Sequence, residues 1–423
     1  MSEARTQMDQ AWTGLNAIVG RENLRPAFAA DAVDGMQPSG VIAPGTAQEV
    51  AEVLRYCNSA GLAIIPRGGG TKLWLGNRPQ KADFILSTER LNRVIEHAWG
   101  DMTVTVEAGC TIDNLQRTLK EHGQQLAADP MRSDGATVGG LLATAESGTL
   151  RIRYGAIRDL VLGLEMALPD GNLIKAGGKV VKNVAGYDLT KLTIGSLGTL
   201  GVITRAVFRL HPVPAATATY STLLPSASEA SKLVLAILDS YLVYTGVQIR
   251  AQRADQVALD IRFEGIPESL DDQYAKLGQV AGAHKFERAG DVWTARQKLY
   301  ADANGSVISK CSVLPAQIGL LCDAVFRCTG SAVKATLVAQ ATGVAEVRLD
   351  AAGVQPLTGA LNALREEVDR LEGTLIVEQC PVSMKQELDV WGTLKDALPL
   401  MQQIKEKFDP ARTLNPGRFV GAI

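Results

Sequence analysis

The spacing of hydrophobic and polar residues alternates between strand and helix periods in the first half of the chain. Strand-like spacing predicts strands at 41–43, 62–65, 103–106, 161–168 and 201–210. Helical spacing predicts helices at 47–61 and 112–122. This alternation is typical of α/β layering, and it ends at a proline pair within 211–214 that favours a linker.

After residue 216 the pattern changes to longer polar helices between strands. Strands are predicted at 219–224, 246–251, 257–263, 307–314, 335–341, 345–349 and 373–380. Helices are predicted at 228–241, 269–282, 292–304, 316–328 and 357–371. The order β-α-β-β-α occurs approximately twice, which predicts an antiparallel sheet covered on one face, either as a single sheet or as a duplicated ferredoxin-like unit.

These patterns predict an α+β chain of more than one domain. We expect a first domain at 1–214, with subdomains at about 1–95 and 96–214, and a second domain at 215–392. A helix at 393–408 and the tail after it, 393–423 in all, are expected to return to the first domain.

Composition adds one anomaly to an otherwise ordinary chain. Glycine accounts for 41 of 423 residues, and 21 of the 41 lie within residues 61–201. The net charge of −2 disfavours nucleic acid as a partner, and the six cysteines lack CxxC spacing, which favours reduced thiols and no metal. The polar N-terminus and the lack of a long apolar run predict a cytoplasmic protein that reaches a membrane only through a partner.

The first glycine cluster follows the apolar strand at 62–65. It consists of Pro66, Arg67, Gly68, Gly69, Gly70, Thr71 and Lys72. Consecutive glycines let neighbouring N–H groups point at one anion, so this segment is a candidate cradle for a pyrophosphate. A tight turn without a ligand is the alternative. The segment matches neither GxGxxG nor GxxxxGK[ST], which disfavours a nicotinamide site and a P-loop.

Two further glycine clusters follow at 133–148 and 175–204. The first of these combines an N-cap residue with a short helix of small residues, which suits a phosphate or a flat ring, with ordinary helix packing as the alternative. The other ends in glycines spaced by three at Gly195, Gly198 and Gly201, which indicates a chain lying flat against another group. A β-arch without a ligand explains one such cluster, but it explains three of them less easily.

Taken in order, the clusters resemble the FAD-binding domain shared by vanillyl-alcohol oxidase and p-cresol methylhydroxylase (PCMH) relatives. The resemblance rests on RGGGTK at 67–72, on KNVAGYDLTKL and IGSLGTLGVIT within 182–204, and on FDPARTLNPGR at 408–418. Within this family the chain is most similar to the E subunits of bacterial glycolate oxidases. The resemblance implies FAD bound by Pro66, Arg67, Gly68, Gly69, Gly70, Thr71, Lys72, Pro130, Asp134, Ala136, Thr137, Gly139, Gly140, Thr144, Gly148, Lys182, Gly186, Asp188, Gly198, Gly201, Val202, Ile203 and Arg418.

The same resemblance implies how the cofactor is held. Many flavin-linking relatives have histidine where Thr71 stands, and threonine cannot form that bond, so we expect non-covalent FAD. Valine at Gly69 or Gly198 is expected to abolish FAD retention, because its side chain would fill the space of the pyrophosphate or of a closely packed backbone.

The family's usual histidine base is missing from the second half of the chain. His97, His122, His211 and His284 stand apart, and none has metal-ligand spacing. Oxidation of a 2-hydroxy acid needs a cation for the carboxylate and a base for the hydroxyl proton. The candidates for these roles are Arg250, Arg296, Lys310, Arg348, Glu378 and Tyr187.

Three functions remain open at this level. The first is an FAD subunit that oxidises glycolate to glyoxylate beside a D-type flavin subunit and an iron–sulfur F-type subunit. The second is a catalytically silent FAD subunit that relays electrons or has a structural role. The third is a stand-alone oxidase of another hydroxy acid such as D-lactate.

Overall fold

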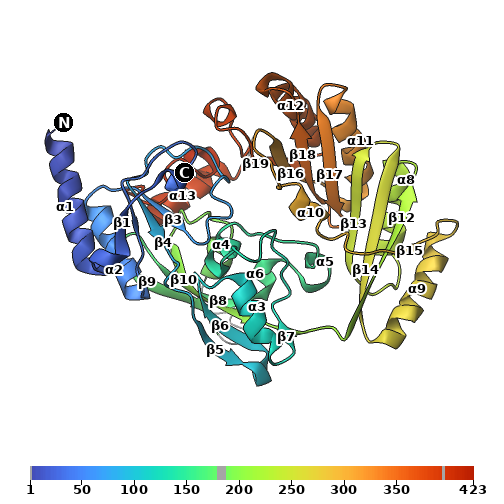
Figure 1. Cartoon of the computed structure of the whole chain (residues 1–423), viewed down its shortest axis with the longest axis horizontal. Coiled ribbons are helices and arrows are strands. Elements are labelled where there is room, and N and C mark those ends of the chain that lie inside the picture. The colour runs from blue at the N-terminus through green and yellow to red at the C-terminus, as the bar shows by residue number, and fades with distance from the viewer. Residues whose placement is uncertain (1, 179–186, 393–395) are drawn as a thin grey trace. The chain divides into compact units, whose positions relative to one another are not determined.

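The structure is a computed structural model that describes residues 2–178, 187–392 and 396–423. These residues form two compact units with separate hydrophobic cores. The first unit contains Met1–Gly148, Gly155–Val213 and Thr393–Ile423, and the second contains Thr149–Tyr154 and Pro214–Gly392 (Figure 1). The α+β class predicted from the sequence is confirmed.

One half of the first unit is a four-stranded sheet with two helices packed on it. The strand order is β1 (Leu24–Pro26), β2 (Gly40–Ile42), β4 (Phe84–Ser87) and β3 (Ile64–Arg67), in which β2, β4 and β3 run parallel. The helix α2 (Ala47–Ser59) forms the crossover between β2 and β3 that a parallel pair requires. Its apolar face joins α1 (Ser2–Val19) in one core with the sheet.

The other half of the first unit is an antiparallel sheet. Its order is β5 (Val94–Ala98), β6 (Thr103–Glu107), β10 (Val202–Arg209), β8 (Val161–Ala167) and β9 (Leu173–Gly177). The helices α3 (Ile112–Lys120), α4 (Val138–Ala143) and α6 (Ile157–Leu160) share its core. The short strands β7 (Gln124–Gln125) and β11 (His211–Pro212) pair with each other, so the expected linker contains a strand.

The second unit is an eight-stranded antiparallel sheet with an internal repeat. Its first half is β12 (Ala216–Leu224), α8 (Ala227–Leu238), β13 (Tyr244–Arg253), β14 (Gln256–Gly265), α9 (Pro267–Ala281) and β15 (Glu287–Arg288). Its second half is β16 (Val307–Ser312), α11 (Ile318–Thr329), β17 (Lys334–Gln340), β18 (Val344–Asp350), α12 (Val354–Arg370) and β19 (Thr374–Gln379).

Both halves have the order β-α-β-β-α-β, and the sheet order β15-β12-β14-β13-β17-β18-β16-β19 joins them at the β13–β17 pair. The four long helices share one core with a single face of the sheet (Figure 1).

Two features of the second unit differ from the sequence-based expectation. The helix expected at 292–304 is wrong in extent, because only α10 (Ala295–Lys298) is helical there. Arg296 and Leu299 are buried by packing against the rest of the unit. In the sequence, buried residues at this spacing resemble one face of a helix, although the segment around them does not form a long one. In addition, α5 (Arg151–Tyr154), which we had expected in the first domain, groups with the second unit.

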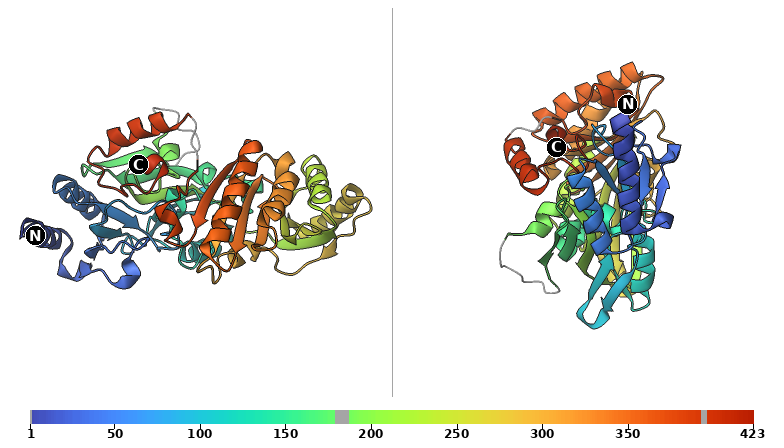
Figure 2. Two further views of the ribbon diagram at one scale, coloured as in Figure 1. Left: turned by 90° about the horizontal axis from the view of Figure 1, so that it is seen from above. Right: turned by 90° about the vertical axis from the view of Figure 1, so that its left-hand side faces the viewer.

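The C-terminal segment groups with the first unit. The helix α13 (Leu398–Phe408) begins later than expected, and residues 393–395 lie outside the described residues. After α13 the tail lies along β3, where Ile64 N donates to Thr413 O at 2.7 Å and Asn415 N donates to Ile64 O at 2.9 Å. Figure 2 shows this red segment against the elements of the same unit. Within the described residues, no helix is long and apolar enough to cross a membrane.

Candidate cofactor site

A cleft in the first unit is lined by parts of all three glycine clusters and by the C-terminal tail. Its lining surrounds ≈830 Å³ of empty space, open solvent included. Arg67 and Thr88 stand at or just beyond the carboxyl ends of the parallel strands β3 and β4, where ligands of such sheets commonly bind. The lining residues are Pro66–Leu73, Thr88, Ala136, Thr137, Gly139–Leu141, Ala143, Thr144, Glu146, Leu197, Gly198, Gly201–Ile203, Asn415 and Arg418.

Two glycines of the first cluster are required by packing between loops. A Cβ on Gly69 would lie 1.6 Å from Gly135 O, and a Cβ on Gly68 would lie 2.0 Å from Thr137 Oγ1. Both neighbours belong to the second glycine cluster. The loops that carry Gly69 and Gly135 are therefore in backbone contact. A side chain at Gly69 would push these loops apart rather than extend into the cleft.

Other glycines leave open space on the cleft side. A Cβ on Gly140 would meet only Thr137 Oγ1, at 3.2 Å, and a Cβ on Gly70 would have no contact closer than 3.6 Å. Gly198 resembles them, with its nearest contact at 3.4 Å. The positive φ angles of Gly70 (+72°) and Gly198 (+68°) also favour glycine independently of the space around them. Because all three line the cleft, added side chains would occupy the volume that a ligand needs.

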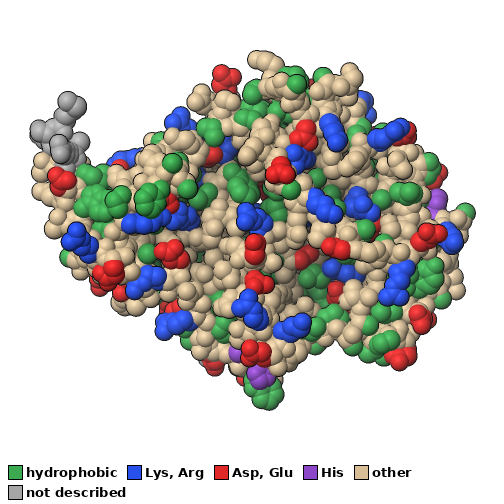
Figure 3. Space-filling view, viewed as in Figure 1, with side chains coloured by type: hydrophobic (Ala, Val, Ile, Leu, Met, Phe, Trp, Pro, Cys, Tyr) green, Lys and Arg blue, Asp and Glu red, His purple; other side chains and the backbone are tan. Residues whose placement is uncertain are grey.

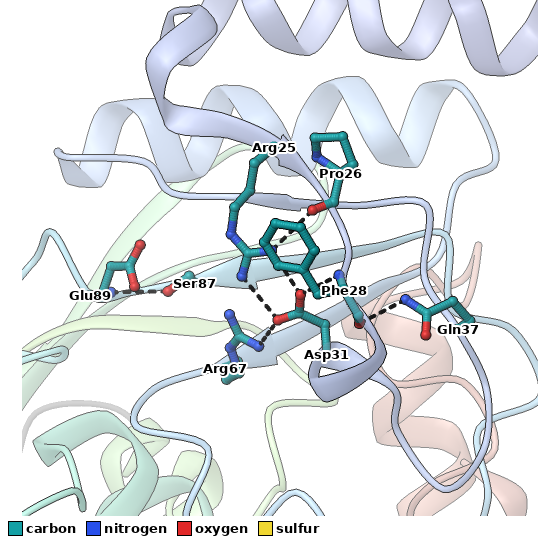
Figure 4. Close-up of polar contacts among 8 residues, drawn as sticks. All are labelled: Arg25, Pro26, Phe28, Asp31, Gln37, Arg67, Ser87 and Glu89. Carbon is teal, nitrogen blue, oxygen red and sulfur yellow. Dashed lines mark hydrogen bonds and ion pairs between the residues drawn. The ribbon is translucent and has the colours of Figure 1, made fainter.

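A buried carboxylate holds the arginine that precedes the first glycine loop. Asp31 Oδ1 accepts from Arg67 Nη1 at 2.6 Å, while Arg25 binds the same carboxylate with two nitrogens (Figure 4). Phe28 N donates to Asp31 Oδ2 at 2.8 Å. The hydrogen bonds from Arg25 and Arg67 hold the pKa of Asp31 well below its usual range, against the opposing effect of burial. Arg67 thus enters the cleft wall in a position set by Asp31.

The lowered pKa predicts how Asp31→Asn changes stability with pH. A carboxyl group whose folded-state pKa is depressed contributes stability above its unfolded pKa of about 3.9, and loses that contribution as pH falls further. At pH 7 we expect Asp31→Asn to lower the free energy of unfolding by about 1–3 kcal/mol. In denaturant titrations the gap to wild type should narrow as the pH falls below about 4.

Asp113→Asn is the matched control, because Asp113 pairs with Arg117 at the surface and such pairs contribute little. A gap for Asp31→Asn that stays constant from pH 7 to pH 3 would contradict the assignment.

A second ion pair lies in the cleft wall. Lys72 Nζ is 3.3 Å from Glu146 Oε2, and the two side chains are only 10% and 3% exposed. Met131 N donates to Glu146 Oε1 at 2.7 Å, which orients the carboxylate. Glu146 lies within the second predicted glycine cluster but is not singled out by the sequence, since a lone glutamate in a small-residue segment carries no local signal.

The tail completes the cleft through buried polar contacts. Arg418 Nη2 donates to Leu73 O at 2.6 Å and to Leu75 O at 2.7 Å, so it fastens the end of the first glycine loop. Burial lowers the pKa of Arg418 to about 10. Asn415 Nδ2 donates to Leu197 O at 2.6 Å, which joins the tail to the third glycine cluster.

Most residues that the resemblance implied for FAD lie together in this cleft. Pro130, Asp134, Gly148 and Asp188 do not line it, and Lys182 and Gly186 lie outside the described residues. A Cβ on Gly148 would lie 2.2 Å from Asp129 Oδ1, so packing explains that glycine. The residues found in the cleft are Pro66, Arg67, Gly68, Gly69, Gly70, Thr71, Lys72, Ala136, Thr137, Gly139, Gly140, Thr144, Gly198, Gly201, Val202, Ile203 and Arg418.

The candidates for catalysis fall into different surroundings. In the second unit, Arg296 Nε donates to Glu346 Oε1 at 2.6 Å, and Lys310 lies opposite Glu346 in the β16–β18 register. Glu378 accepts a hydrogen bond from Tyr300, whose pKa is raised by burial and by that carboxylate. In the first unit, Tyr187 is 94% exposed.

The remaining arginine candidates are both paired. Arg250 binds Asp260 with two nitrogens, and Arg348 binds Asp350.

On the face in Figure 3, basic and acidic side chains are interspersed.

The chemistry of the cleft fits a dinucleotide cofactor. Gly70 and Gly140 leave open space in the cleft, and Arg67 and Lys72 are cations in its wall, which suits an anionic pyrophosphate. Apolar Leu141, Val202 and Ile203 supply flat contact for a ring system.

Comparison with known proteins agrees with this fit. Residues 38–177 match the family described as FAD binding domain. This match supports FAD as the cofactor of the cleft.

Curated relatives give the nearer context. The chain is 32% identical over 263 residues to glycolate oxidase subunit GlcD of Bacillus subtilis, a match that covers 60% of this chain and 56% of the relative. It is 35% identical over 223 residues to the mitochondrial D-lactate dehydrogenase [cytochrome] of Arabidopsis thaliana, covering 52% and 38%. A D-2-hydroxyglutarate dehydrogenase of Xanthomonas citri is 35% identical over 189 residues, covering 45% and 40%. The matches thus span 38–56% of the length of these relatives.

Solved structures share the fold over nearly the whole chain. p-Cresol methylhydroxylase with substrate bound superposes with a TM-score of 0.78 at 17% identity, covering 98% of this chain and 96% of that one. Alkyldihydroxyacetonephosphate synthase superposes with a TM-score of 0.76 at 19% identity, covering 96% and 84%. At this identity the likeness extends to the fold alone.

Proposed function

We propose that the protein is an FAD-dependent enzyme that oxidises a small 2-hydroxy acid to the corresponding 2-oxo acid. The observation that carries the proposal is the cofactor cleft of an FAD-binding domain in a chain similar to three kinds of hydroxy-acid enzyme. The bound FAD would take up the hydride from the carbon that bears the hydroxyl group. In the first unit, Arg67 and Lys72 would bind its negative charge, while Asp31 and Glu146 keep the two cations in place.

Glycolate is the substrate we propose first. The similarity to a glycolate oxidase subunit supports it, and D-lactate is the alternative that the D-lactate dehydrogenase relatives support. We further propose that the chain works with a D-type flavin subunit and with an iron–sulfur subunit that receives the electrons. In such a complex, any association with a membrane comes through a partner.

A second candidate function is an FAD subunit that relays electrons without oxidising substrate itself. The histidine content of the second unit supports it, because His284 is the unit's one histidine. It follows the end of α9, and its Nε2 lies 3.9 Å from Oε2 of Glu229 on α8. A histidine base on the sheet is therefore not part of this chain's chemistry, and a hydroxyl proton would need another acceptor.

Anaerobic mixing distinguishes these functions. The purified, FAD-loaded chain is mixed with glycolate and, separately, with D-lactate, and the long-wavelength flavin absorbance is followed. We expect bleaching with at least one acid, because transfer of a hydride reduces the flavin. A flavin that stays oxidised until the partner subunits are added supports the relay function, and a purified chain that takes up no FAD contradicts both.

We also propose that FAD is held without a covalent bond. Among the described residues that line the cleft there is no histidine, cysteine or tyrosine, the side chains that commonly link flavins. Acid precipitation of the holoprotein should therefore leave the flavin absorbance in the supernatant. Absorbance that stays with the precipitated protein would contradict the proposal.

A further inference from the structure

The ion pair of Lys72 and Glu146 brings two opposite charges into the wall of the cofactor cleft. Lys72 Nζ lies 3.3 Å from Glu146 Oε2, and both side chains are nearly buried. Met131 N donates to the other carboxylate oxygen at 2.7 Å, so Glu146 is held from two sides. Both residues of the pair line the cleft. A ligand in the cleft therefore meets a cation and an anion side by side.

The other ion pair at the cleft is built differently. Arg67 lines the cleft, whereas its partner Asp31 does not. Arg67 thus offers positive charge alone, which suits the pyrophosphate of a dinucleotide. Glu146 instead adds negative charge to the wall, and its carboxylate would repel a pyrophosphate placed beside it. The two cations of the cleft are therefore suited to different parts of FAD.

The two ion pairs also lie toward opposite ends of the helix α4. Gly68, which follows Arg67, packs against Thr137, the N-cap residue of α4. Glu146 comes after the other end of the helix, and residues at both ends of α4 line the cleft. The six residues of α4 span about 9 Å. A pyrophosphate held by the glycine loops at the first end leaves the second end to another part of the cofactor.

The hydrogen-bonding groups of the second end match a ring edge of FAD. The Lys72 ammonium only donates hydrogen bonds and the Glu146 carboxylate only accepts them, and each has capacity beyond the contact between them. The pyrimidine edge of the flavin ring system places an N–H donor between two carbonyl acceptors. Adenine also has a donor beside an acceptor. The reduction potential separates the two rings, because only the flavin changes its charge on reduction.

We propose that Lys72 and Glu146 bind the pyrimidine edge of the flavin ring and set its reduction potential, while Arg67 serves the pyrophosphate. Reduction adds negative charge to the flavin, and nearby protein charges tune how readily it occurs. Lys72 stabilises the reduced form, and Glu146 limits that stabilisation. The assignment requires FAD in the cleft, but it does not depend on which acid the protein oxidises.

The test is the reduction potential of the FAD-loaded full chain. The flavin is reduced anaerobically with dithionite beside a reference dye, so no substrate is needed. Lys72→Met should shift the equilibrium at least tenfold toward oxidised FAD, which lowers the potential by about 30 mV for a two-electron couple. Glu146→Gln should shift the equilibrium at least tenfold in the opposite direction. Shifts of opposite sign are the signature of two opposite charges beside the ring.

Two further variants serve as controls. Lys72→Met/Glu146→Gln removes both charges together, which avoids an unpaired buried charge, and its potential should return close to that of wild type. Lys175→Met is the matched control, because Lys175 forms a similar pair with Glu165, at 3.4 Å in the same unit, but does not line the cleft. It should keep the wild-type potential and the wild-type affinity for FAD.

The affinity for FAD separates the flavin ring from the rest of the cofactor. Arg67→Met should weaken FAD binding to the apoprotein at least tenfold while the potential stays near that of wild type. If Lys72→Met behaves in this way, the pair contacts the pyrophosphate or the adenosine, and the proposal is wrong. Potentials of Lys72→Met and Glu146→Gln that both equal that of Lys175→Met also overturn it.

Two remaining outcomes are covered by the same measurements. For a variant that loses FAD during purification, the shift is read from the ratio of its affinities for reduced and oxidised FAD, which linkage makes equivalent to the potential. A wild-type chain that binds no FAD overturns the proposal. A flavin that no hydroxy acid bleaches, but whose potential shifts as expected in the variants, contradicts the proposed oxidation and supports the assignment of Lys72 and Glu146.

Discussion

Asp409→Ala is expected to remove FAD from the protein and to destabilise the first unit by about 3–5 kcal/mol. Asp409 is fully buried and accepts hydrogen bonds from Lys405 Nζ at 2.6 Å and from the backbone N–H of Thr413 and Leu414. Lys405 Nζ also donates to Thr199 O at 2.8 Å and to Leu414 O at 3.0 Å. Alanine would leave the ammonium of Lys405 buried without its counter-charge.

Loss of the Asp409 contacts should also weaken FAD binding, because the turn at Asp409 positions the tail that lines the cleft. Asn415 and Arg418 line the cleft only a few residues beyond Asp409, and Arg418 fastens Leu73 and Leu75. If the turn at Asp409 unfolds, Asn415 and Arg418 are no longer held in position to make these contacts. We therefore expect a lower thermal midpoint of the apoprotein and a low ratio of flavin to protein absorbance after gel filtration.

Glu406→Ala is the control for this prediction, since Glu406 is on the same helix and exposed. It should leave both the thermal midpoint and the flavin content unchanged. The double variant Lys405→Met/Asp409→Ala removes both charges and should recover part of the stability. Full flavin content in Asp409→Ala would show that the tail is not needed for the cofactor.

The tail illustrates what the sequence could predict. The motif at 408–418 was enough to expect its return to the first domain, and the structure groups it there. The sequence could not show that Lys405 reaches Thr199 O, because that contact joins residues 206 positions apart. Local patterns predict elements, whereas the partners of a buried charge depend on tertiary packing.

In the second unit, too, local patterns predicted the elements but not the partners of a buried charge. Period-two patterning located its main strands, because each alternates between the helix-side core and the other face. The same alternation places Glu346 of β18 on the face of the sheet away from the helices. It is buried with Arg296, from the segment where the sequence pattern predicted a longer helix than the structure has.

Gly140→Val is expected to remove FAD without unfolding the protein. Gly140 has an ordinary helical backbone within α4 and lines the cleft, and the first atom of an added side chain would meet only Thr137 Oγ1, at 3.2 Å. The valine methyl groups would then occupy cofactor space. We expect the free energy of unfolding of the apoprotein to stay within about 1 kcal/mol of wild type, while the flavin content after gel filtration falls severalfold.

Gly69→Val should fail in a different way. Its Cβ would overlap Gly135 O at 1.6 Å, so the two glycine loops cannot remain in contact and the apoprotein itself is expected to lose stability. Gly100→Val is the matched control, because a side chain there meets nothing within 4 Å. Together the variants separate two reasons for the glycine excess: contact between loops at Gly69 and room for the cofactor at Gly140. A Gly140→Val protein that keeps its full flavin content would show that the open side of this helix faces no cofactor.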